Sequence, residues 1–60
     1  MSGNPYKVGD AVRFPRGYGH LTGTVVKVVL ARLHIEVNDE FLSPRVFVEV
    51  YSNCNRSAKV

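Results

Sequence analysis

The side chains in this chain best suited to chemistry are those that could neutralise a phosphate or stack on a base. They are Arg13, Arg16, Tyr18, His20, Lys27 and Arg45. Arginine and lysine bind phosphates, and an aromatic ring or an imidazole on a loop can stack on an unpaired base. Arg13 and Arg16 flank a glycine-rich loop that contains Tyr18 and His20, so this pair is the strongest candidate. The six residues predict a nucleic-acid-binding surface around that loop.

A scattered, solvated set of charges is the alternative to one basic patch. Arg32 adds to the positive charge, but acidic residues are interspersed with the basic ones: Glu36, Asp39 and Glu49. The formal net charge is +3 and the pI is about 9.4, which permits a polyanionic partner without requiring one. His34 falls on the polar side of its segment, where we expect it to be solvated or paired across strands.

Two aromatic residues near the end of the chain suggest a second kind of surface. Phe47 and Tyr51 alternate with valines at positions 46, 48 and 50. If the valines form the buried face of a strand, Phe47 and Tyr51 are exposed beside Arg45 and could bind a protein partner, form a dimer seam or stack on bases. The alternative is that the two rings form a second small core under one of the termini.

No set of residues predicts a reaction. The chain lacks a carboxylate pair, a catalytic triad, a phosphate-binding loop and a Cys/His cluster with zinc spacing. Its single cysteine, Cys54, has no neighbouring His or Lys to activate it and no internal disulfide partner. We therefore expect no catalytic residue, cofactor or metal, and a binding module rather than an enzyme. A site shared between subunits of a homo-oligomer is the remaining route to catalysis.

Composition and alternation predict an all-β domain. The chain has 60 residues, of which eleven are valine, a residue that suits strands. Four strands are predicted, near residues 11–14, 23–30, 33–38 and 45–51. No apolar run approaches the roughly 20 residues of a membrane span, so we expect no membrane association and a cytoplasmic location. Short strands without a helix signal predict a small closed or nearly closed barrel.

The predicted strands differ in how clearly their faces can be assigned. Val12 and Phe14 share one face of the first strand, with Arg13 on the other. The third strand buries alternate residues from Leu33, namely Leu33, Ile35 and Val37. Residues 23–30 are almost continuously apolar, which favours a bent strand with a bulge that buries both faces. Ala31-Arg32 is predicted to be the hairpin turn after it.

The remaining segments are predicted to be turns, loops or flexible ends. Three glycines, at positions 17, 19 and 23, indicate positive φ or close backbone approach in and after the loop at residues 16–22. Asp10 is expected to cap backbone N–H groups in a turn. Phe41 and Leu42 are expected to lie under the barrel. Residues 1–6 are predicted to be a flexible N-terminus, residues 7–51 the domain, and residues 52–60 a disordered tail.

At residues 7–14 and 21–25 the sequence resembles the KOW motif of SH3-like barrels. Its most specific parts are Gly9-Asp10 and Gly23-x-Val25, and the similarity extends over residues 7–51. His20 departs from the motif, because a glycine usually stands three residues before Gly23. Small uncharacterised bacterial SH3-like proteins of the same length are also similar. The resemblance implies an SH3-like barrel of four to five antiparallel strands.

KOW domains belong to ribosomal proteins and transcription elongation factors, so the resemblance implies contact with RNA or with the transcription machinery through the loops. The expected partner is RNA or DNA. The alternative is a protein partner or self-assembly through Phe47 and Tyr51, with the chain a monomer or a weak homo-oligomer.

Overall fold

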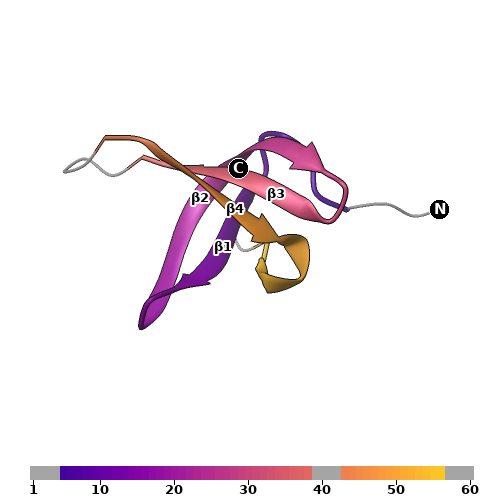
Figure 1. The fold of residues 1–60 in the computed structure, drawn as a ribbon. Helices are drawn as coiled ribbons and strands as arrows, with labels where there is room; N and C mark the ends of the chain where they lie inside the picture. The colour runs from indigo at the N-terminus through magenta and orange to yellow at the C-terminus, as the bar shows by residue number, and fades with distance from the viewer. Residues whose placement is uncertain (1–4, 39–42, 57–60) are drawn as a thin grey trace.

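The computed structural model describes residues 5–38 and 43–56, which form one antiparallel sheet (Figure 1). Its strands are β1 (Ala11–Arg16), β2 (Gly19–Val29), β3 (Arg32–Val37) and β4 (Arg45–Val50), and a short 3-10 helix, η1 (Tyr51–Asn53), follows. The strand order is β1-β2-β3-β4. The all-β class and the four antiparallel strands are confirmed. Pairing between β1 and β4 does not close the sheet, so both are edge strands.

The β1–β2 hairpin is longer and tighter than the sequence suggested. The prediction of a loop over residues 16–22 is wrong, because β1 continues to Arg16 and β2 begins at Gly19. Pro15 is tolerated because β1 is an edge strand, where a missing N–H breaks no ladder bond. The two-residue turn is possible because Gly17 adopts a φ of +62°.

Strand β2 carries the bulge that its continuous apolar sequence favoured, but it does not bury both faces, because Val26 and Val29 stay exposed. The register with β3 shifts between Val25 and Lys27, which confirms the predicted bulge. Gly23 allows a close approach to β3, because a Cβ there would lie 2.6 Å from the carbonyl oxygen of Glu36 and 2.6 Å from Cγ2 of Ile35. Gly19 has open space around it and a φ outside the positive range. The prediction that each of these glycines needs a positive φ or a close backbone approach therefore fails at Gly19.

The β2–β3 hairpin turns one residue earlier than predicted. Val29 pairs with Arg32, so the turn is Leu30-Ala31 rather than Ala31-Arg32. Leu30 has a φ of 45°, in the left-handed region that costs a residue with a Cβ about 1–2 kcal/mol. The strong pairing of the flanking valine-rich strands holds the residue there.

The core lies between the bent sheet and the segment that follows η1. Its buried side chains are Val12, Phe14, Val25, Leu33, Ile35 and Cys54. The predicted inward faces of β1 and β3 are therefore confirmed. Val37 is half-buried at the edge of the same cluster.

Strand β4 could bury either its valines or its aromatics, and the structure shows the aromatics on the inward face. Its three valines are exposed, whereas Phe47 and Tyr51 pack against the core. The Phe47 ring lies 5.5 Å from that of Phe14, and the Tyr51 ring lies 6.3 Å from that of Tyr6. An aromatic ring buries far more apolar area than a valine, so the strand turns its aromatics inward. Of the two alternatives for Phe47 and Tyr51, the structure therefore favours the one in which the rings pack inward.

Both ends of the domain extend further than predicted. Cys54 is only 6% exposed, and Asn55 exchanges two backbone hydrogen bonds with Arg13, of 2.9 and 2.8 Å. The Tyr6 hydroxyl donates a 2.6 Å hydrogen bond to the Cys54 carbonyl. The predictions of a disordered tail and a flexible N-terminus therefore fail for residues 52–56 and for Tyr6. Residues 1–4 and 57–60, and the predicted positions of Phe41 and Leu42, lie outside the described residues.

Asp10 holds the turn before β1. Its carboxylate accepts a 2.8 Å hydrogen bond from the backbone N–H of Lys7, which confirms the predicted capping role. The same carboxylate forms a 3.0 Å ion pair with Arg56, and that guanidinium lies 5.1 Å from the centre of the Tyr6 ring. These contacts join the start of the domain to its end. In the described residues no helix is long and apolar enough to cross a membrane.

Candidate nucleic-acid interface

An open groove of about 430 Å³ runs along β4 beside the end of β1. Its lining residues are Arg16, Arg45, Val46, Phe47 and Val48. Strand β4 supplies four of them in succession, and the β1–β2 hairpin supplies the fifth. The groove therefore combines two cations with one aromatic ring.

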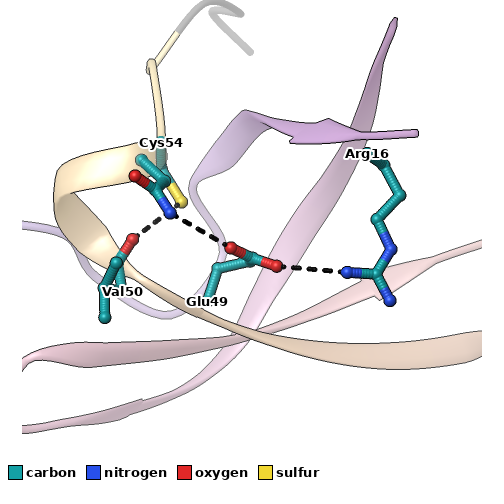
Figure 2. A network of polar contacts seen from close by, with 5 residues as sticks. Arg16, Glu49, Val50 and Cys54 are labelled. Carbon is teal, nitrogen blue, oxygen red and sulfur yellow. Dashed lines mark hydrogen bonds and ion pairs between the residues drawn. The ribbon is translucent and has the colours of Figure 1, made fainter. Parts of the chain in front are cut away.

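Two contacts fix the position of the Arg16 side chain over the Phe47 ring. Its guanidinium carbon lies 4.8 Å from the centre of the ring, within the range of a cation–π contact. Its Nη1 atom forms a 3.5 Å ion pair with Oε2 of Glu49 (Figure 2). The Arg16 side chain is still 53% exposed, so the guanidinium is oriented without being withdrawn from solvent.

Glu49 connects the groove to the C-terminal segment. Its Oε1 atom accepts a 3.4 Å hydrogen bond from Nδ2 of Asn53, in η1. Just beyond, the Cys54 thiol lies 3.8 Å from the Val50 carbonyl oxygen (Figure 2). Burial, and secondarily the Glu49 charge, raise the pKa of Cys54, so the thiol is protonated at neutral pH, where it packs in the core.

Arg45 is the second cation that lines the groove. It is the first residue of β4, pairs with Val37 and is exposed. Among the described residues no carboxylate forms an ion pair with it. Its charge is therefore more available to an anion than that of Arg16.

The tip of the β1–β2 hairpin presents two further ring side chains. Tyr18 occupies the two-residue turn and is fully exposed, at 111% relative accessibility. His20 follows at the start of β2 and is also exposed. Arg16 stands at the base of the same turn, so the hairpin links Tyr18 to the groove. Tyr18 contributes nothing to the core, which leaves its ring free for stacking.

The structure separates the six predicted nucleic-acid residues into three groups. Arg16 and Arg45 share the groove, while Tyr18 and His20 lie at the hairpin tip. Side chains alternate between the two faces of a strand. Arg13 therefore lies on the outward face of β1, whereas Arg16, three residues on, belongs to the opposite face. Lys27 pairs with His34 on the outward face. The structure therefore does not bring Arg13 and Arg16, the preferred pair of candidates, together on one face.

Sequence reasoning missed the role of Glu49 and misplaced Phe47. Glu49 counted only as a charge that diluted a basic patch, whereas it orients Arg16 from a position 33 residues away. Phe47 forms a half-buried wall of the groove rather than an exposed platform. No local pattern could reveal either contact, because each one joins β1 to β4.

Residues 5–38 and 43–56 contain no group of three His, Cys, Asp or Glu side chains that could hold an ion. Comparison of the chain with protein-family models, with curated proteins and with solved structures finds no significant match. The geometry of the groove is therefore the basis for a functional proposal.

Proposed function

We propose that this chain is a non-catalytic module that binds single-stranded nucleic acid, primarily RNA, in the groove along β4. One observation carries the proposal: the groove holds two arginines and an aromatic ring, and a fully exposed tyrosine lies on the adjoining hairpin. Grooves that bind single strands combine cations for the backbone with rings for the bases.

Each group has a distinct task in this proposal. Arg45 and Arg16 bind backbone phosphates, and the cation–π contact keeps Arg16 in place before the ligand arrives. Tyr18 stacks on an unpaired base, which a duplex would keep inside its own stack. With only two phosphates neutralised, binding is weak and depends on salt, with a slope of about −1.4 in log K against log salt concentration.

The order of the elements supports the SH3-like, KOW-like barrel that the sequence motif implies. Four strands follow one another across the sheet, a 3-10 helix comes next, and the chain then returns to β1 at Asn55. That return adds a short fifth segment next to β1, in keeping with a barrel of four to five strands. In this proposal the KOW-like stretch supplies the hairpin that carries Arg16 and Tyr18.

The alternative proposal, a protein partner or self-assembly through Phe47 and Tyr51, has less support, because both rings are half-buried. Both rings pack against the core, next to Phe14 and Tyr6. The apolar surface that remains exposed on β4 consists of valines instead.

Titration of isotope-labelled protein with single-stranded and duplex RNA and DNA at low salt tests the proposal. We expect single strands to shift the backbone resonances of the β1–β2 turn and of β4. Arg45→Ala should reduce the salt slope by about 0.7, and Tyr18→Ala should weaken binding by about 1–3 kcal/mol if one base stacks there. Both side chains are exposed, so neither variant should alter folding.

Lys27→Ala is the matched control, because it removes the same charge from the outward face. It should leave the salt slope nearly unchanged. Equal effects of Lys27→Ala and Arg45→Ala would show that net charge alone drives binding. An absence of shifts in the turn and in β4 at near-millimolar oligonucleotide would refute the proposal.

A further inference from the structure

The turn of the β2–β3 hairpin carries a leucine at a position where the backbone favours glycine. Leu30 is the first of the two turn residues, and its φ is 45°. The favoured two-residue turns need a positive φ at this position, which glycine, asparagine or aspartate adopts most easily. The Leu30 side chain is nevertheless 88% exposed. The residue therefore strains the backbone and exposes apolar surface at once, a combination that points to binding rather than to stability.

A small pocket lies beside this turn. Its volume is about 250 Å³, and it is lined by Ala31, Val50, Tyr51 and Ser52. The Tyr51 N–H donates a 3.1 Å hydrogen bond to the Ala31 carbonyl, which joins the turn to the start of η1. Pockets for whole small-molecule ligands have volumes of roughly 300–1,000 Å³, so this one suits a single side chain. None of its lining residues belongs to the groove at residues 45–48.

Two exposed cations lie next to the pocket on the outward face of the sheet. Arg32 pairs with Val29 on one side and with Val50, a lining residue of the pocket, on the other. Lys27 lies one outward row further from the turn, about 7 Å along the strands. Among the described residues no carboxylate forms an ion pair with either cation. Glu36 is four residues from Arg32, roughly 13 Å along β3, so the positive charge beside the pocket is not neutralised.

We propose that Leu30, the pocket and these two cations bind an acidic, extended segment of another protein. Carboxylates two residues apart in an extended segment are about 7 Å apart, which matches the spacing of the Lys27 and Arg32 rows. The next side chain on the same face then reaches the turn, where an apolar group can fill the pocket beside Leu30. The segment that fits therefore has the pattern Glu-x-Glu-x-Leu. The inference uses no residue of the groove and stands apart from the proposed function.

Titration of the isotope-labelled full chain with the end-blocked peptide Ser-Glu-Ser-Glu-Ser-Leu-Ser tests the inference. The resonances of the β2–β3 turn and of η1 should shift, with a dissociation constant of roughly 0.1–1 mM, because one small pocket and two exposed ion pairs give weak binding. A peptide with lysine in place of glutamate should not bind. A peptide with serine in place of leucine should bind about fivefold more weakly or worse.

Leu30→Gly separates a binding role from a structural one. The variant should bind the acidic peptide about fivefold more weakly or worse, while its Tm stays the same or rises by a few degrees, because glycine accepts the positive φ. Val8→Ser is the matched control: Val8 is 64% exposed and lies outside the sheet, so this variant should bind like the wild type. A lower Tm with unchanged peptide binding would overturn the role assigned to Leu30.

A charge reversal tests the assigned ion pairs. Arg32→Glu should lose the glutamate peptide and gain weak binding to the lysine peptide, and circular dichroism checks that the variant is folded. An absence of shifts at several-millimolar peptide, or equal binding of both peptides by the wild type, would overturn the inference. Binding to vesicles of phosphatidylserine and phosphatidylcholine without a response to the peptide would overturn it in favour of a lipid surface. Leu30→Gly should bind oligonucleotides like the wild type, so this inference and the proposed function can fail separately.

Discussion

Gly23→Ala is the substitution whose effect follows most directly from the geometry of the sheet. The added Cβ would lie 2.6 Å from the Glu36 carbonyl oxygen, 2.6 Å from Cγ2 of Ile35 and 3.0 Å from Cγ2 of Val37. The side-chain methyl groups can shift by small rotations, but the carbonyl belongs to the backbone of β3. Relief therefore requires β2 and β3 to move apart where they enclose the core.

The size of the effect comes from two opposing terms. Overpacking of this kind costs about 1–3 kcal/mol, and contact with a backbone atom places it in the upper half of that range. The alanine also restricts the unfolded chain, which returns about 0.4–1 kcal/mol. A net loss of about 1–2.5 kcal/mol remains, out of the roughly 3–9 kcal/mol expected for a domain of this size.

Thermal unfolding followed by circular dichroism measures this loss. In a domain this small we expect the Tm to fall by about 5–15 °C. Gly19→Ala is the matched control, since it makes the same chemical change in the same strand with nothing within 4 Å of the new Cβ. That variant should be as stable as the wild type or slightly more so. Equal Tm values for the two variants would refute the argument that Gly23 is required by close packing.

Two further predictions concern the contact between the chain ends. Tyr6→Phe removes the 2.6 Å hydrogen bond to the Cys54 carbonyl, and urea denaturation should show a loss of about 1 kcal/mol; no loss would mean that water replaces the hydroxyl. Burial raises the pKa of both Tyr6 and Cys54, so the folded state disfavours their deprotonation. Their contribution to the free energy of unfolding should therefore be constant near neutral pH and fall as the pH rises through about 9, the ordinary pKa of a thiol. In Cys54→Ala the free energy of unfolding should fall less steeply at the start of this pH range. An unchanged pH profile would contradict the assignment of that fall to the Cys54 thiol.

Only part of the candidate site was predictable, because its residues come from two strands, β1 and β4, that lie far apart in the sequence. Arg16, Tyr18 and Arg45 were identifiable because arginines and an aromatic beside a glycine-rich turn are suited to nucleic acid. Their grouping was not identifiable. Arg13 looked like the natural companion of Arg16, yet an odd spacing on a strand places the two on opposite faces. The companions of Arg16 are Phe47 and Glu49, which the sheet brings from β4.

The sequence alone determined the class of the fold and much of its inward face. Valine-rich segments with two-residue alternation specified four antiparallel strands, and the alternation at Val12, Phe14, Leu33 and Ile35 identified most of the core. The near-continuous apolar run in β2 indicated the bulge. These features are local, because side-chain alternation and β propensity depend on neighbours along the chain.

Only the tertiary structure decided which face of β4 is buried and where the domain ends. Valines and aromatics alternate in β4, so either face could serve as the core, and the choice depends on the space left by Phe14 and Tyr6. Cys54 lies in a polar sequence with no periodic pattern, yet it completes the core, because backbone pairing of Asn55 with Arg13 fixes its position. Contacts between residues about 40 positions apart set these outcomes, and no local pattern encodes such contacts.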